Sequence, residues 1–222
     1  MEIVLIIAGI AAVVGIIIWA AWLYKKKRSE ALEYIATSLN LSFKRKNDNS
    51  LIGAHDYFVL FSKGHSKKIS NLMTGSTGDI NINIMDYKYT VGSGKNSSTH
   101  LQTIIIVQSA HLHLPTFTLS PENFFHKIGG MFGYQDIDFA SHPKFSKQYL
   151  LRGKDEDSIK ETFSNEVIEF YEKDKTLRTE GCDDKFIYYK GVKRLPPKEI
   201  QFFLQETINL YGLLKVQTSG LH

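Results

Sequence analysis

The sequence predicts an α+β protein that begins with a single transmembrane helix. Residues 3–24 form an uncharged, mainly aliphatic run, and about 20 such residues at a rise of about 1.5 Å each cross a hydrocarbon core of roughly 30 Å. Several runs between residues 41 and 119 have the alternation or the β-branched and aromatic content of strands. Helical patterns lie before, between and after these runs, an order typical of α+β domains.

The apolar run is interpreted as a membrane span and not as a cleaved signal peptide or a buried helix. A signal peptide carries a basic region before a shorter apolar core, whereas Met1 and Glu2 offer no basic side chain. A helix that is apolar on all sides is rare inside a small soluble chain. Basic segments stay in the cytoplasm, so we expect the N-terminus outside the cell membrane and residues 25–222 in the cytoplasm.

Aromatic and basic side chains mark the inner end of this span. Amphipathic rings favour the membrane interface, and cations next to it fix the topology. The same cations would be attracted to anionic headgroups at about 1 kcal/mol each, although a topology signal alone is the simpler interpretation. The predicted flank consists of Trp19, Trp22, Tyr24, Lys25, Lys26, Lys27 and Arg28.

Composition excludes several functional classes. The formal net charge is +4, and the basic block 25–28 accounts for it, so the remaining chain predicts no nucleic-acid surface. Cys182 is the single cysteine. It permits no internal disulfide and no paired-cysteine metal or redox motif, and it suits a reducing compartment. No cofactor is expected.

Residues 29–146 are predicted to hold one helix and an antiparallel meander. Leu32, Ile35 and Ala36 share a face of a helix over 29–40, with Ser29 as a suitable N-cap, and this helix continues from the membrane span or bends away from it. The connections between strand candidates are too short for crossover helices. The predicted strands are 41–46, 57–62, 69–73, 79–91, 99–108 and 111–119, with a basic turn at 63–68 and chain-breaking residues at 74–78.

One strand has a clear period of two. Ile80, Ile82 and Ile84 alternate with polar or flexible residues, and Asp86 falls in the same register. Alternation of this kind indicates a strand with one buried face.

Residues 147–215 are predicted to form a β-α-β-β-α unit, packed on the meander either as a subdomain or as part of the same domain. A short helix is also expected from Pro121 or Glu122 to Lys127, and 134–146 is expected to be irregular. The elements of the unit are a strand at 149–153, a helix over 155–173, a hairpin of 177–180 with 185–189, and a helix over 196–214, followed by a frayed tail at 216–222.

The soluble part resembles a group of uncharacterised bacterial proteins that pair an N-terminal membrane helix with a domain of unknown function. The similarity covers about residues 41–205 and implies a membrane-anchored domain; no activity, cofactor or catalytic residue can be carried over from it. It is carried by the run from Asp86 to Lys95 with Gln102-Thr103, and by Asn71 with Gly75, Leu114-Pro115, Pro121-Glu122, Gly133 with Asp136-Ile137-Asp138, and Phe145-Ser146 before 149–153.

Three motifs are weak candidates for chemistry. Asp136 and Asp138 with His142 form the best acidic cluster, because paired carboxylates serve acid–base work or bind hard cations; turn capping is the simpler interpretation. His111 and His113, two residues apart on a predicted strand, would need a third ligand such as His100 or His126 to hold zinc. Residues 92–95 (Gly-Ser-Gly-Lys) lack the spacing of a phosphate-binding loop and fit a hairpin turn better.

The leading functional hypothesis is a non-enzymatic, single-pass membrane protein whose cytoplasmic domain binds a protein partner, in contact with lipid and not with nucleic acid. One alternative is an enzyme or ligand-binding domain acting on a membrane or lipid substrate through Asp136, Asp138 and His142. Another is a structural subunit of a larger membrane complex, in which small residues of the apolar helix make the contacts.

Overall fold

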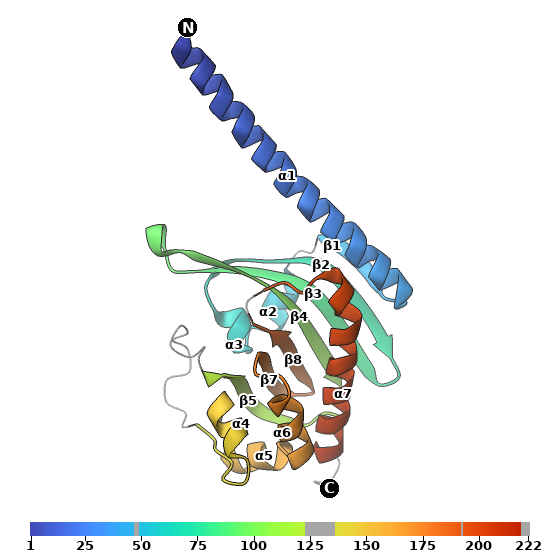
Figure 1. The fold of residues 1–222 in the computed structure, drawn as a ribbon. Coiled ribbons are helices and arrows are strands. Elements are labelled where there is room, and N and C mark those ends of the chain that lie inside the picture. The colour runs from blue at the N-terminus through green and yellow to red at the C-terminus, as the bar shows by residue number, and fades with distance from the viewer. Residues whose placement is uncertain (47–48, 123–135, 192, 219–222) are drawn as a thin grey trace.

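A long helix, α1 (Glu2–Ser38), projects from a domain built on one antiparallel sheet (Figure 1). The computed structural model describes residues 1–222 except 47–48, 123–135, 192 and 219–222. The predicted α+β class and the N-terminal apolar helix are both confirmed. The β-α-β-β-α order of the C-terminal part is also confirmed, except that its first helix is divided in two.

The sheet has eight strands, in the order β1-β2-β3-β4-β8-β7-β5-β6. Strands β2, β3 and β4 form the predicted meander, but the hairpin β7–β8 lies between β4 and β5, so the meander does not continue into β5. Residues 29–146 and 147–215 therefore contribute strands to the same sheet. The strands are β1 (Ser42–Lys46), β2 (His65–Thr77), β3 (Ile80–Val91), β4 (Ser98–Ser109), β5 (Leu114–Pro121), β6 (Tyr149–Gly153), β7 (Leu177–Asp183) and β8 (Lys185–Lys190).

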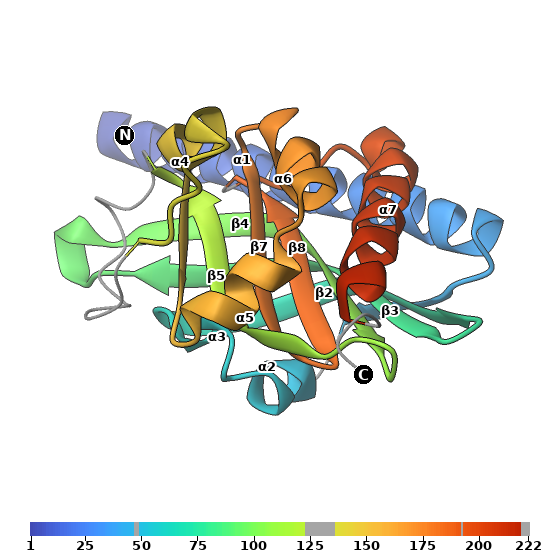
Figure 2. The ribbon, with the colours of Figure 1, turned by 90° about the horizontal axis from the view of Figure 1, so that it is seen from below.

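Helices cover both faces of the sheet (Figure 2). One face packs against α4 to α7 and the C-terminal part of α1, and the other against α2 and α3. Strand β4 shows the division, because Ile105 and Val107 belong to the first core and Ile104 and Ile106 to the second. The remaining helical segments are α2 (Ser50–Ala54), α3 (Val59–Ser62), η1 (Gly94–Asn96), α4 (Pro143–Gln148), α5 (Glu156–Thr162), α6 (Asn165–Glu172), η3 (Pro197–Glu199) and α7 (Ile200–Thr218).

Helix α1 runs from the apolar segment into the domain as one helix. Its apolar part is long and apolar enough to cross a membrane, and 0% of its most apolar 18-residue window is buried, so the interpretation as a buried core helix is wrong. The following turns belong to the fold, because Leu32 and Ala36 are buried against the sheet. Ser29 lies inside this helix and is not its N-cap.

Two predicted elements have a different conformation. Residues 57–62 are not a strand: Phe58 precedes the helical turn α3, whose Leu60 and Phe61 are buried beneath the sheet. The helix predicted over 155–173 is divided at Phe163 into α5 and α6. Each has its own N-cap: the Asp155 side chain accepts a hydrogen bond from the Ser158 amide, and Ser164 caps α6.

Other boundaries also differ from the sequence prediction. Strand β2 occupies both the predicted basic turn at 63–68, from His65 onward, and the predicted breaker segment at 74–78, as far as Thr77. The irregular segment 134–146 contains the start of α4. Helix α7 continues to Thr218, four residues beyond the predicted end at 214. The helix predicted after Glu122 lies outside the described residues.

Candidate functional site

A buried ion pair joins the N-terminal helix α1 to the sheet. The Arg28 guanidinium donates from Nε to Asp86 Oδ2 (2.8 Å) and from Nη2 to Asp86 Oδ1 (2.7 Å). The two side chains are only 6% and 1% exposed. A carboxylate this deeply buried needs a charged, hydrogen-bonded partner, and a bidentate guanidinium provides the strongest one. This pair is the joint between α1 and β3.

Neighbouring polar groups complete the joint. Asn71 Nδ2 donates to Asp86 Oδ2 (2.8 Å), and Ser29 Oγ donates to Asn71 Oδ1 (2.7 Å). Arg28 Nη1 donates to the carbonyl oxygen of Leu195 (2.8 Å). The network therefore connects α1 to β2, to β3 and to the segment before α7. It accounts for Ser29, which faces Asn71 from within the helix.

The joint corrects the predicted role of Arg28. The sequence groups Arg28 with Lys25, Lys26 and Lys27 as cations at the membrane flank, but Arg28 is 7% exposed and points into the domain. The three lysines remain exposed, as do Trp19, Trp22 and Tyr24. The Lys26 ammonium lies 5.3 Å from the centre of the Trp22 ring, a cation–π distance.

A groove of about 560 Å³ opens beside the joint, between α1 and strands β1 to β4. We call it the basic groove. Eight of its fourteen described lining residues are lysine or arginine, and none of the fourteen is acidic. It is lined by Trp22, Lys25, Lys26, Arg28, Ser29, Arg45, Lys46, Lys68, Ser70, Asn71, Lys88, Thr99, Leu101 and Arg194.

The predicted acidic cluster holds the edge of the sheet. Asp136 Oδ1 accepts a hydrogen bond from the Leu151 amide of β6 (3.0 Å). Burial, and then the charge of Asp138, raise the pKa of the Asp136 carboxyl. His142 lies at the N-terminus of α4, with Nδ1 3.0 Å from Ser141 Oγ. No hydrogen bond or ion pair within the described chain joins His142 to either aspartate.

His111 and His113 lie in the turn before β5 and not on a strand. His111 Nε2 is 3.5 Å from Asp79 Oδ2. His113 lines a separate open groove with Thr116, Cys182 and Asp183. The two histidines thus belong to different surroundings, and no group of three or more potential metal-ligating side chains occurs among the described residues.

Residues 92–95 form a turn, as the sequence predicts. They connect β3 to β4, and Gly92 (φ +80°) has a backbone conformation that suits glycine. Added at Gly92, a Cβ atom would also lie 2.5 Å from the carbonyl oxygen of Asn96. The geometry of the turn therefore explains the glycine at position 92. The helical segment that follows, Gly94–Asn96, is too short to bind phosphate at its N-terminus.

A second buried ionisable group lies on the opposite face. Glu180 of β7 accepts hydrogen bonds from the Leu60 amide (3.1 Å) and from the Tyr189 hydroxyl (3.0 Å). Burial raises the pKa of Glu180 and lowers the pKa of the nearby Lys63 to about 8. This carboxyl holds the first turn of α3, so its role is structural.

These features define an α+β sheet domain joined to an apolar N-terminal helix by a buried ion pair. Among solved structures, the fold is similar to that of the mycobacterial trehalose monomycolate transport factor A, TtfA, with a TM-score of 0.60 over 86% of this chain and 93% of that chain. The sequences are 8% identical, so the likeness is one of fold. No protein-family model matches the chain, and no curated protein matches its sequence.

Proposed function

We propose that this chain is a single-pass membrane protein, with its N-terminus outside and its folded domain in the cytoplasm, that binds a protein partner and catalyses no reaction. The apolar part of α1 is the anchor. The domain acts by presenting a binding surface at a fixed height and angle at the inner face of the bilayer.

The joint between Arg28 and Asp86 is the observation that carries this proposal. A domain that only has to be retained at a membrane needs no more than a flexible linker. Here the helix has no break between the apolar segment and the domain, and a buried bidentate ion pair fixes its position on the sheet. A rigid connection is useful where a surface must meet a partner that is itself oriented by the membrane.

The fold comparison is consistent with this role. The similar solved structure is that of a trehalose monomycolate transport factor. At 8% identity we carry over from it only the fold.

The experiment changes the connection without touching the joint. A flexible Gly-Ser segment is inserted between Tyr24 and Lys25 of a tagged full-length chain, which is then crosslinked in cells and analysed by mass spectrometry. The matched control carries the same insertion after Met1, at the far end of the anchor. We expect the wild type and the control to capture the same stoichiometric partner and the Tyr24 insertion to lose most of it.

Two results would contradict the proposal. Equal capture of the partner by both insertion variants would show that a fixed orientation is unnecessary. A reporter fused after His222 that is active only outside the cytoplasm would show that the domain lies on the other side of the membrane.

A further inference from the structure

We propose that the basic groove binds the phosphate-bearing headgroup of an anionic membrane lipid. The inference rests on the proposed function in one respect, because it needs the groove to lie at the headgroup layer. It then names the class of ligand that the groove binds.

The helical wall of the groove is a single stripe of α1. Trp22, Lys25, Lys26 and Ser29 are spaced by three or four residues, so they share one face of the helix. Trp22 lies at the end nearest the apolar segment and Ser29 at the joint. The stripe therefore leads from the membrane interface, where tryptophan is favoured, into the domain.

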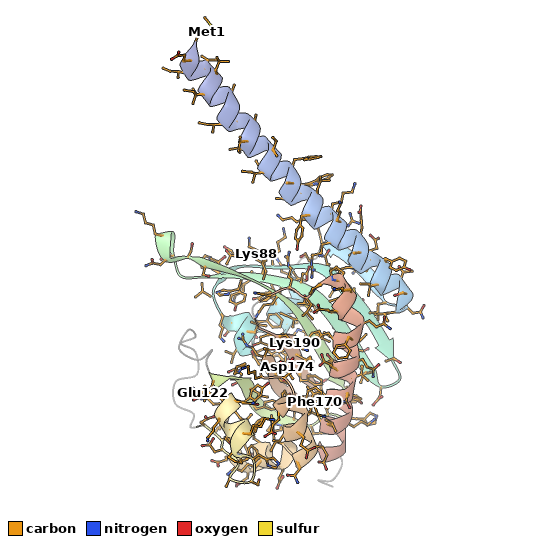
Figure 3. The ribbon with its side chains drawn as sticks, in the orientation of Figure 1. Met1, Lys88, Glu122, Phe170, Asp174 and Lys190 are labelled. Carbon is orange, nitrogen blue, oxygen red and sulfur yellow. The ribbon has the colours of Figure 1, made fainter. Side chains whose placement is uncertain are left out.

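The sheet wall carries lysines without acidic partners. Lys68 of β2 and Lys88 of β3 line the groove, and Lys88 lies at the end of the domain nearest α1 (Figure 3). Neither side chain forms an ion pair with the part of the chain that the structure describes, and the same holds for Lys25 and Lys46. The paired cations of the groove are Arg28 and Arg194 with Asp86, Lys26 with Glu30, and Arg45 with Glu33.

Two of these lysines are placed directly against each other. Lys68 and Lys88 are register partners in the antiparallel pair β2–β3, so their Cβ atoms lie about 5 Å apart on the same face of the sheet. Like charges in this position destabilise a sheet. A local conflict of this kind is expected at functional sites, and an anion bound between the two ammonium groups would remove it.

The shape and position of the groove favour a lipid over a soluble anion. Its volume of about 560 Å³ is within the roughly 300–1,000 Å³ of ordinary ligand sites. Trp22 and Leu101 give it apolar surface next to the membrane end of α1. A phosphate headgroup would lie between the lysines while its acyl chains stay in the bilayer. The excess of cations selects against an uncharged headgroup.

The test uses the full-length chain in nanodiscs made of equal parts phosphatidylglycerol and phosphatidylcholine, with the retained lipid identified by native mass spectrometry. We expect the wild type to retain phosphatidylglycerol in preference to phosphatidylcholine. Lys68→Gln with Lys88→Gln should lower that preference about 25-fold, at roughly a factor of five for each cation near the membrane surface. The control, Lys147→Gln with Lys175→Gln, removes the same charge from exposed positions outside the groove.

The melting temperature separates a loss of lipid binding from a loss of folding. Neutralising a repelling pair of lysines should leave the melting temperature unchanged or raise it. Equal retention of the two lipids by the wild type would overturn the proposal, and so would a groove variant that behaves like the control. Release of phosphatidylglycerol by millimolar inorganic phosphate would assign the groove to a soluble anion. The nanodiscs contain no other protein, so this test is independent of the partner experiment. Failure to retain phosphatidylglycerol would overturn only the lipid proposal, and failure to capture a protein partner would overturn only the proposed function.

Discussion

Two polar clusters fasten helices to strand β3 and to the residue just before it, and they differ in burial. At the middle of β3, Asp86 binds Arg28 of α1, with side chains 1% and 6% exposed. Just before β3, Asp79 Oδ2 accepts hydrogen bonds from Lys215 Nζ (2.9 Å) and the Tyr211 hydroxyl (2.6 Å) of α7. There the Lys215 and Asp79 side chains are 39% and 37% exposed.

The difference shows what each cluster contributes. Water screens the exposed cluster and competes for its hydrogen bonds, so it adds little to stability. The buried pair is costly to form but far more costly to break, because each partner would be left as an uncompensated charge. Helix α7 is also held by its apolar face, through Leu210 and Leu214. Helix α1 is held by the polar joint at Arg28 and, in the following turns, by the buried Leu32 and Ala36.

The largest effect is expected from Arg28→Ala. This change leaves the buried Asp86 carboxylate with Arg194 as its remaining cation, whose Nε lies 3.6 Å away and makes no hydrogen bond within the described residues, and it should lower the free energy of unfolding by about 3–5 kcal/mol. The measurement is denaturation of the full-length chain in detergent, followed by circular dichroism. A loss below about 1 kcal/mol would show that the joint is worth no more than a surface pair.

Asn71→Ala should have an intermediate effect. The Asn71 amide bridges Asp86 and Ser29, and its removal leaves buried groups without partners, at about 1–3 kcal/mol. The backbone of Asn71 is also left-handed (φ +52°), which alanine adopts less readily. Asn71→Gly keeps that backbone without the amide, so the difference between the two variants measured by the same denaturation separates the two causes. Equal stability of wild type and both variants would remove Asn71 from the joint.

A smaller effect should appear in the pH dependence of the exposed cluster. Hydrogen bonds from Lys215 and then from Tyr211 hold the pKa of Asp79 below its ordinary value. The unfolded chain therefore binds this proton more readily, and the stabilisation is present above about pH 4 and lost as the pH falls toward the folded pKa. Asp79→Asn should reduce the acid-side fall in melting temperature. Parallel pH profiles for the variant and the wild type would contradict this.

The smallest effect is expected from Arg45→Ala. Arg45 Nη2 is 2.8 Å from Glu33 Oε2, and both side chains are about half exposed, at 49% and 52%. Loss of such a pair changes the unfolding free energy by about 0–1 kcal/mol. Because it removes one arginine next to α1, it is the matched control for Arg28→Ala. A loss of unfolding free energy as large as that caused by Arg28→Ala would show that burial does not explain the difference between the two ion pairs.

Local patterns were sufficient to predict the apolar helix, most strands and the α+β class. They also contained a signal for the joint, because the alternation of Ile80, Ile82 and Ile84 places Asp86 on the buried face. A buried carboxylate requires a cation. The sequence does not show which one, since Arg28 lies 58 residues away and looks like one member of a basic block.

Other features depend on tertiary structure. Residues 57–62 have strand-like composition, but a short apolar run fits a buried helical turn equally well, and the Glu180 carboxylate that holds that turn is 120 residues away. The insertion of β7–β8 between β4 and β5 is likewise a long-range choice. The basic groove combines residues from α1, four strands and the segment before α7, so no spacing in the sequence predicts it.

Because helix α1 is unbroken, the apolar segment and the folded domain are expected to move together. Its 37 residues span about 55 Å at 1.5 Å per residue, and the helix has no break between its apolar part and the part fixed to the sheet. Membrane helices adjust their tilt when the bilayer changes thickness. With the apolar part of α1 across a bilayer, as proposed above, a change of tilt would turn the whole domain through the same angle, so bilayer thickness would set the orientation of the domain at the membrane surface.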